Sequence, residues 1–214
     1  MWRTNRYPRH DDIKMFAKDV FNDEDYDLSR LTQTIRHLPM LDKSREVLSK
    51  LINKGLYIGQ PARDYQLNKK HVKPNAPELM PGLCVYTAHQ FEPNFIPNNQ
   101  KIVANVPLTY DFAFWNSSLA SAVWEECKYI ANAINIDVNI QKWSDIFHLL
   151  DTDFKTLTLK QIVHLNLMIQ AIAVLYFKHK SLTDDYKKGE LTDYIVDNTI
   201  TNLIKDYHRA CVDT

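Results

Sequence analysis

The sequence predicts an α+β fold in which helices at both ends of the chain flank a central region of strands and loops. Helix-breaking residues are concentrated in the middle: seven of the nine prolines lie in residues 61–107, and three of the four glycines lie in residues 55–82. Short runs rich in β-branched and aromatic residues occupy the same region. The chain has 214 residues, 45% of them hydrophobic, which suits one domain with an appended helical part.

Three short helices are expected in the first 54 residues. An aspartate stands where each of them would begin, and aspartate is a favoured N-terminal cap. The expected helices are residues 13–21 after Asp11 or Asp12, residues 28–38 after Asp27, and residues 43–54 after Asp42. Gly55 then ends the third helix, so residues 1–41 form a helical N-terminal segment and residues 42–157 begin with a helix.

The middle of the chain predicts strands. Residues 83–87, 101–107 and 110–115 are the three runs rich in β-branched and aromatic side chains. Residues 92–99 contain two prolines and three asparagines, which predicts a turn-rich connection. Residues 42–157 are therefore expected to form an α+β core that carries the candidate site.

From Ser117 onward the sequence predicts helices again. Ser117 or Ser118 is expected to cap a helix that runs to about residue 135, and Thr158 a longer one to about residue 179. The second is apolar nearly all round, which indicates burial on several sides. A last helix is expected over about residues 191–210, so residues 158–214 form a C-terminal helical pair packed on the core.

Composition excludes several classes of function. Acidic and basic residues balance at 26 each, which argues against a nucleic-acid coat or a membrane-surface role. The three cysteines are widely spaced and form no C-x-x-C motif. They therefore indicate neither a disulfide framework nor a thiolate metal site. The N-terminus lacks an apolar signal segment, and residues 165–177 are too few to span a bilayer. A reducing, cytoplasmic location without a metal is expected.

Cys84 is the most suggestive residue for chemistry. It follows a turn, Met80-Pro81-Gly82, and lies at the start of an expected strand, where a turn exposes the thiol and a strand holds it still. Cysteine is reactive because its thiolate is accessible near neutral pH, especially beside a cation. Free cysteine is also among the most buried residue types, so Cys84 as a core thiol stays an equal alternative.

Several ordered residues resemble the thymidylate synthase family, including its phage branch of deoxypyrimidine-monophosphate hydroxymethylases. The resemblance runs from about residue 42 to the end. Its elements are the helix before Arg63, Pro74, the segment 80–84 with Cys84, Gln90-Phe91, Asp111, Trp115, the helix residues Tyr129-Ile130-Ala131, the segment 147–150 with His148, and the closing residues 206–211.

This resemblance implies a thymidylate synthase-like mixed sheet with surrounding helices. It also implies a transferase of nucleotide metabolism, which moves a one-carbon unit from 5,10-methylenetetrahydrofolate to C5 of dUMP or dCMP. The implied enzyme is a symmetric homodimer, because the family's phosphate-binding arginine reaches across the subunit interface. It would be cytoplasmic, in the host cytoplasm for a phage protein.

Site roles follow from the same resemblance. Cys84 would be the nucleophile that adds to C6, and His148 would orient water or the sugar hydroxyl. Arg63 would bind the phosphate through its planar guanidinium group. Gln90 would also contact the substrate. Asn116 or Ser117 would contact the edge of the pyrimidine base. Asp111 and Trp115 would contact the folate.

Some residues depart from the family pattern and keep other interpretations open. No Arg-Ser-x-Asp is present, since the chain reads Leu108-Thr109-Tyr110-Asp111, and Leu150 replaces an expected tyrosine. The alternative function is a non-enzymatic assembly or regulatory protein, and a third is a helical protein-binding module. The structural alternatives are a satisfied histidine for His148, a surface ion pair with Asp64 for Arg63, a turn cap for Asp111, and a helix start for Asn116.

Overall fold

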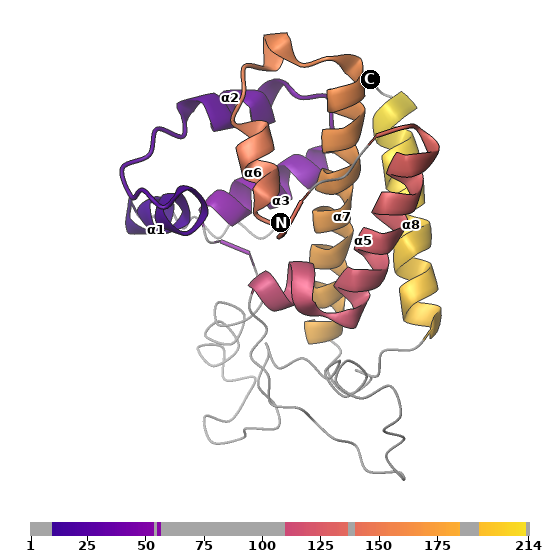
Figure 1. Cartoon of the computed structure of the whole chain (residues 1–214). Coiled ribbons are helices and arrows are strands. Elements are labelled where there is room, and N and C mark those ends of the chain that lie inside the picture. Colours follow the sequence, from indigo (N-terminus) through magenta and orange to yellow (C-terminus); the bar gives the residue numbers. More distant parts are fainter. Residues whose placement is uncertain (1–9, 54, 57–109, 137–139, 185–192, 213–214) are drawn as a thin grey trace, which may run out of the picture.

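The computed structural model describes residues 10–53, 55–56, 110–136, 140–184 and 193–212. These residues form helices joined by short connections, and no strand occurs among them (Figure 1). The elements are α1 (His10–Phe21), α2 (Ser29–His37), α3 (Asp42–Ile52), the π-helix η3 (Phe112–Asn116), α5 (Ser118–Ala133), α6 (Asp145–Leu150), the short 3₁₀-helix η4 (Phe154–Thr156), α7 (Leu159–Asp184) and α8 (Asp193–Val212).

The predicted α+β fold with a thymidylate synthase-like mixed sheet is therefore wrong for the part of the chain that is described. The clearest correction concerns residues 110–115, expected as a strand, which are helical and lead into η3. Phe112, Ala113 and Phe114 are buried in succession, whereas a strand would turn every second side chain to the opposite face. A helical turn lying across α5 and α7 buries all three. The expected strands 83–87 and 101–107 lie outside the described residues.

The predicted helices of the two flanks are confirmed, with shifted ends. Asp27 was predicted to cap α2, but Leu28 occupies the N-cap position and Asp27 lies one residue earlier, where its Oδ1 accepts a hydrogen bond of 2.9 Å from the Ser29 amide. Ser117 Oγ accepts one of 3.0 Å from the Ala120 amide and caps α5. Asp11 and Asp42 lie inside the first turns of α1 and α3. Their negative charges interact favourably there with the positive end of the helix dipole.

A capping box begins α7. The Thr158 amide donates to Gln161 Oε1 at 2.9 Å, and the Gln161 amide donates back to Thr158 Oγ1 at 3.3 Å. The helix continues to Asp184, beyond the predicted end at residue 179. By length and composition alone, Leu159–Lys180 could cross a membrane, but 67% of its most apolar window is buried inside the fold. Most of this apolar surface therefore packs against the rest of the protein.

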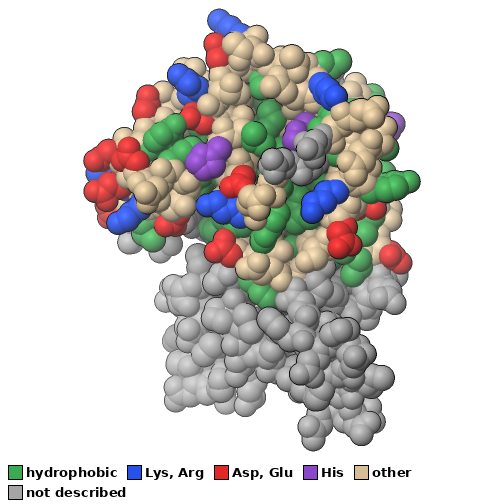
Figure 2. Space-filling view, viewed as in Figure 1, with side chains coloured by type: hydrophobic (Ala, Val, Ile, Leu, Met, Phe, Trp, Pro, Cys, Tyr) green, Lys and Arg blue, Asp and Glu red, His purple; other side chains and the backbone are tan. Residues whose placement is uncertain are grey.

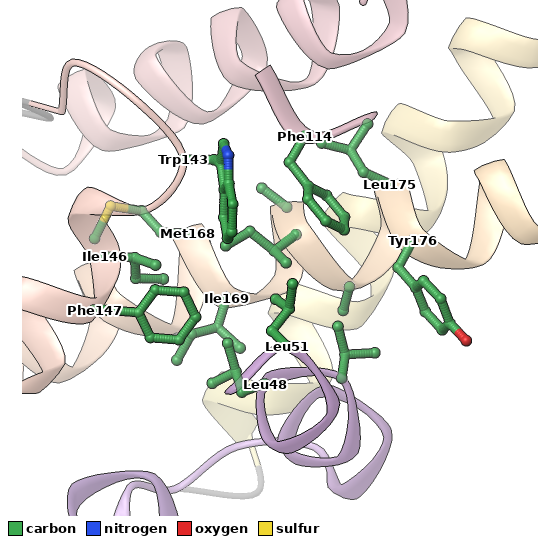
Figure 3. Packing of buried hydrophobic residues seen from close by; sticks show 14 of the residues in the cluster. Leu48, Leu51, Phe114, Trp143, Ile146, Phe147, Met168, Ile169, Leu175 and Tyr176 are labelled. Carbon is green, nitrogen blue, oxygen red and sulfur yellow. The ribbon is translucent and has the colours of Figure 1, made fainter. Parts of the chain in front are cut away.

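The centre of the fold is α7. It packs against α3, α5, α6, α8 and η3, with α1 to α3 gathered on one side and α5 and α8 on the other (Figure 1). The core around it is continuous and draws on every helix from α1 to α8. Figure 3 shows the meeting of its parts: Leu48 and Leu51 from α3, Phe114 from η3, Trp143, Ile146 and Phe147 around α6, and Met168, Ile169 and Leu175 from α7.

Buried polar side chains of α7 fix it against its neighbours. Asn166 Nδ2 donates to the Pro39 carbonyl oxygen at 2.7 Å, and Gln170 Oε1 accepts from Ser44 Oγ at 2.8 Å. Near the other end, the buried His179 ring is hydrogen-bonded to the Ala113 backbone. Burial lowers the pKa of His179 to about 4, so its ring stays neutral in the fold.

Candidate functional site

A groove lies between α7, α8 and the start of α3. Its volume is about 560 Å³, within the range of ligand-binding clefts. The groove is lined by Lys43 of α3, by Val174, Phe177 and Lys178 of α7, and by Asn198, Thr199, Asn202, Lys205, Asp206 and Arg209 of α8. We call this surface the basic groove.

Helix periodicity builds the groove. The lining residues of α8 recur at intervals of three or four positions, so they form one stripe along the helix. Val174, Phe177 and Lys178 follow the same rule on α7. The two helices pack side by side, and the two stripes therefore become the walls of a single channel.

Charge is the most distinctive property of the groove, which carries four cations and one carboxylate. Lys43 Nζ lies 2.6 Å from Asp206 Oδ2, so this pair neutralises itself. Within the described part of the chain, no carboxylate lies within 4.0 Å of the cationic groups of Lys178, Lys205 or Arg209. Lys205 and Arg209 are exposed, and the groove therefore offers three positive charges to a partner.

Uncharged side chains give the groove a mixed character. The Phe177 ring is 38% exposed, an aromatic surface beside the cations. Asn202 Nδ2 donates to Asn198 Oδ1 at 3.1 Å, and the two amides stand one helical turn apart on α8. Aromatic and arginine side chains are enriched where proteins contact one another.

Three of the predicted site residues, Cys84, Arg63 and Gln90, lie outside the described residues. Two others, Ser117 and Asp111, hold the fold together. Ser117 is buried and caps α5 through its hydroxyl. Asp111 Oδ1 accepts a hydrogen bond of 2.6 Å from Trp143 Nε1.

The other predicted residues lie at the surface. Trp115 is half-buried and packs against Trp124 with ring centroids 5.5 Å apart. Asn116 is exposed at the end of η3. His148 is exposed on α6, with its ring edge-on to Phe21 at 4.9 Å. None of these residues lines the basic groove.

The described residues offer neither a reactive thiol at Cys127 nor a cluster of metal ligands. Burial raises the pKa of the Cys127 thiol, which keeps it protonated and unreactive. No group of three histidine, cysteine or carboxylate side chains in the described ranges is placed to hold a metal ion. Asp151, three positions after His148, accepts a hydrogen bond at Oδ2 from the Tyr26 hydroxyl.

The sequence signals of the basic groove were weak. Lys205 and Arg209 are four positions apart, which places both on one face of α8. Lys43 lies 163 positions before Asp206, and only the packing of α3 near α7 and α8 brings it there. The two cations of α8 could be found from the sequence. The contribution of Lys43 to the groove could not.

Comparison of the chain with protein-family models, with curated proteins and with solved structures finds no match. The resemblance to thymidylate synthases implied a mixed sheet, and the described residues contradict that fold. One-carbon transfer to a deoxypyrimidine monophosphate, with 5,10-methylenetetrahydrofolate as donor, stays a prediction that the described residues do not test. Its nucleophile and phosphate-binding arginine, Cys84 and Arg63, lie outside them.

Proposed function

We propose that this chain is a protein-interaction module whose basic groove docks an acidic surface of a protein partner. This places it in the class of non-enzymatic assembly or regulatory proteins. The observation that carries the proposal is the set of three cations along the groove, Lys178, Lys205 and Arg209, with no carboxylate partner among the described residues.

The length of the groove favours a protein surface over a single small anion. Its wall on α8 runs from Asn198 to Arg209, which is about 16 Å at 1.5 Å per residue. Lys178 adds a cation from the opposite helix. Lys205 and Arg209 lie one turn apart on α8 and Lys178 lies on the facing helix, so a partner with several carboxylates can pair with more of these cations than one phosphate can.

The total charge favours a protein partner over a nucleic acid. The chain as a whole has no basic excess, and affinity for nucleic acid comes mainly from the number of phosphates neutralised. Complementary charges between proteins work differently, since a few pairs steer the encounter and fix the orientation of the partners. The exposed Phe177 ring adds an apolar contact at the same place.

A direct test is binding of a fluorescently labelled poly-L-glutamate peptide to the full chain, measured by anisotropy at low and high salt. We expect saturable binding that weakens with salt. The double variant Lys205→Glu and Arg209→Glu should bind about tenfold more weakly or not at all.

A matched control carries the same change of charge elsewhere. Lys155 and Lys160 are exposed and lie outside the groove, so Lys155→Glu with Lys160→Glu should bind the peptide like the unaltered chain. Equal losses in both double variants would show that only net charge matters and would contradict the proposal. If a single-stranded oligonucleotide binds more tightly than the peptide at the same salt concentration, the partner of the groove is a nucleic acid and not a protein.

A further inference from the structure

A second charged surface has the opposite sign to the basic groove. It lies at the end of α1 and in the turn that leads to α2, and we call it the acidic corner. Five carboxylate residues within nine positions make it up, all of them exposed: Asp19, Asp23, Glu24, Asp25 and Asp27. Lys14 Nζ lies 2.7 Å from Asp25 Oδ1, so this pair neutralises itself and the corner keeps four other carboxylates.

The backbone holds the acidic corner in a defined shape. Asn22 has a φ of 58°, a left-handed conformation that ends α1 abruptly. Asp23 Oδ1 accepts a hydrogen bond of 3.0 Å from the Asp25 amide, and Asp27 accepts from Ser29. The turn is therefore ordered by its own side chains, and its carboxylates project at a protruding edge of the molecule. Acidic side chains gather at that edge in Figure 2.

The acidic corner and the basic groove lie on different sides of the fold. The corner belongs to α1 and α2, which pack on α3 and α6, whereas most of the groove belongs to α7 and α8 (Figure 1). The two surfaces are therefore separated by the body of the protein, and one copy cannot bring its own corner into its own groove. Opposite charges kept apart on a chain of zero net charge favour contact between copies.

We infer that the acidic partner of the basic groove is the acidic corner of a second copy of this chain. This inference rests on the proposed function and names the partner. Glu24 and Asp23 of one copy would meet Lys205 and Arg209 of the next. Because donor and acceptor surfaces differ, the contact is heterologous, so it joins copies head to tail into an open chain or a closed ring. The symmetric dimer implied by the family resemblance uses a different geometry.

Charge exchange between the two surfaces tests this inference. The groove variant is Lys205→Glu with Arg209→Glu, and the corner variant is Glu24→Lys, which leaves the hydrogen bond from the Asp25 amide to Asp23 in place. Sedimentation velocity of the full chain at low salt should show species larger than one copy, and high salt should dissociate them. Each variant alone should sediment as a single copy, and an equimolar mixture of the two should associate again.

Controls separate charge pairing from loss of structure. Glu24, Lys205 and Arg209 are all exposed, and circular dichroism should show unchanged helix content in each variant. A second groove variant, Lys178→Glu with Lys205→Glu, should also dissociate the assembly, whereas Lys155→Glu with Lys160→Glu should leave it intact.

Two results would overturn the inference. One is an unaltered chain that sediments as a single copy at every concentration and salt, and the other is a mixture of variants that stays dissociated. If the poly-L-glutamate peptide still binds the groove in either case, the proposed function stands and only the identity of the partner is wrong. If the peptide does not bind, both fall.

Discussion

Lys43, in the first turn of α3, and Asp206, near the end of α8, form an ion pair with Nζ and Oδ2 2.6 Å apart. The Asp206 side chain is only 9% exposed, whereas Lys43 is 40% exposed. Both residues line the basic groove, and the pair joins two helices that are far apart in sequence. It is therefore a contact that both the stability of the fold and the shape of the groove depend on.

Removing the lysine should destabilise the fold. In Lys43→Met the nearly buried Asp206 carboxylate loses its cation, and we expect the free energy of unfolding to fall by about 1–2 kcal/mol in urea denaturation. Lys50→Met is the matched control, because Lys50 pairs with an exposed glutamate, Glu46, and should cost at most about 0.5 kcal/mol. Equal effects of the two substitutions would show that the burial of Asp206 is unimportant.

The buried hydrogen bond between Ser44 and Gln170 predicts a non-additive pair of substitutions. Ser44→Ala leaves the fully buried Gln170 amide without its 2.8 Å donor, and should cost about 1–3 kcal/mol of unfolding free energy. Gln170 Nε2 already lacks a partner among the described residues. Ser44→Ala combined with Gln170→Met removes both polar groups and should be more stable than Ser44→Ala alone. A double variant less stable than either single variant would contradict this account.

Burial of His179 predicts a pH dependence of stability. Its pKa is lowered from 6.5 to about 4, so the unfolded chain binds a proton in a pH range where the folded chain does not. The fold should therefore have its full stability above pH 6.5 and lose on the order of 2–4 kcal/mol as the pH falls toward 4.

The His179→Gln variant removes this titration while keeping a polar side chain. Urea denaturation at several pH values should show a flatter profile between pH 6.5 and 4 than that of the unaltered chain. A profile with unchanged slope in His179→Gln would assign the pH dependence to other groups.

The hydrogen bond from Trp143 to Asp111 predicts that two substitutions of Asp111 reduce the free energy of unfolding by different amounts. Asp111→Ala leaves the Nε1 of the buried Trp143 without its acceptor, and should cost about 1–2 kcal/mol of unfolding free energy. Asp111→Asn keeps a side-chain oxygen at the same place, so it should lose less than half as much. Equal losses in thermal or urea denaturation would show that the hydrogen bond contributes nothing.

The helical flanks could be predicted from sequence because their signals are local. Ser117 and Thr158 each make the capping contact that their position predicts, and Asp27 binds the Ser29 amide next to the N-cap of α2. The core face of α3, with Val47, Leu48, Leu51 and Ile52, also follows from helical spacing, and all four residues are buried.

Residues 110–115 could not be assigned from sequence because their composition favours strands. Aromatic residues are common in strands, but here they fill a π-helix that packs on α5 and α7. Tertiary packing decided the structure of this segment against its local preference. The candidate site was missed for a related reason, since Lys43 reaches the groove only through the packing of helices distant in sequence.

The late position of α7 in the chain has a consequence for synthesis. The N-terminal helices are made first, yet Ser44 waits for Gln170, 126 residues later, before its hydrogen-bond partner exists. At about 5–20 residues per second, this interval lasts roughly 6–25 s. During that time the apolar face of α3 is without the helix that covers it in the finished protein, and exposed apolar surface of this kind makes a nascent chain prone to aggregate. The core is complete only when α8 has followed α7, because both helices contribute to it.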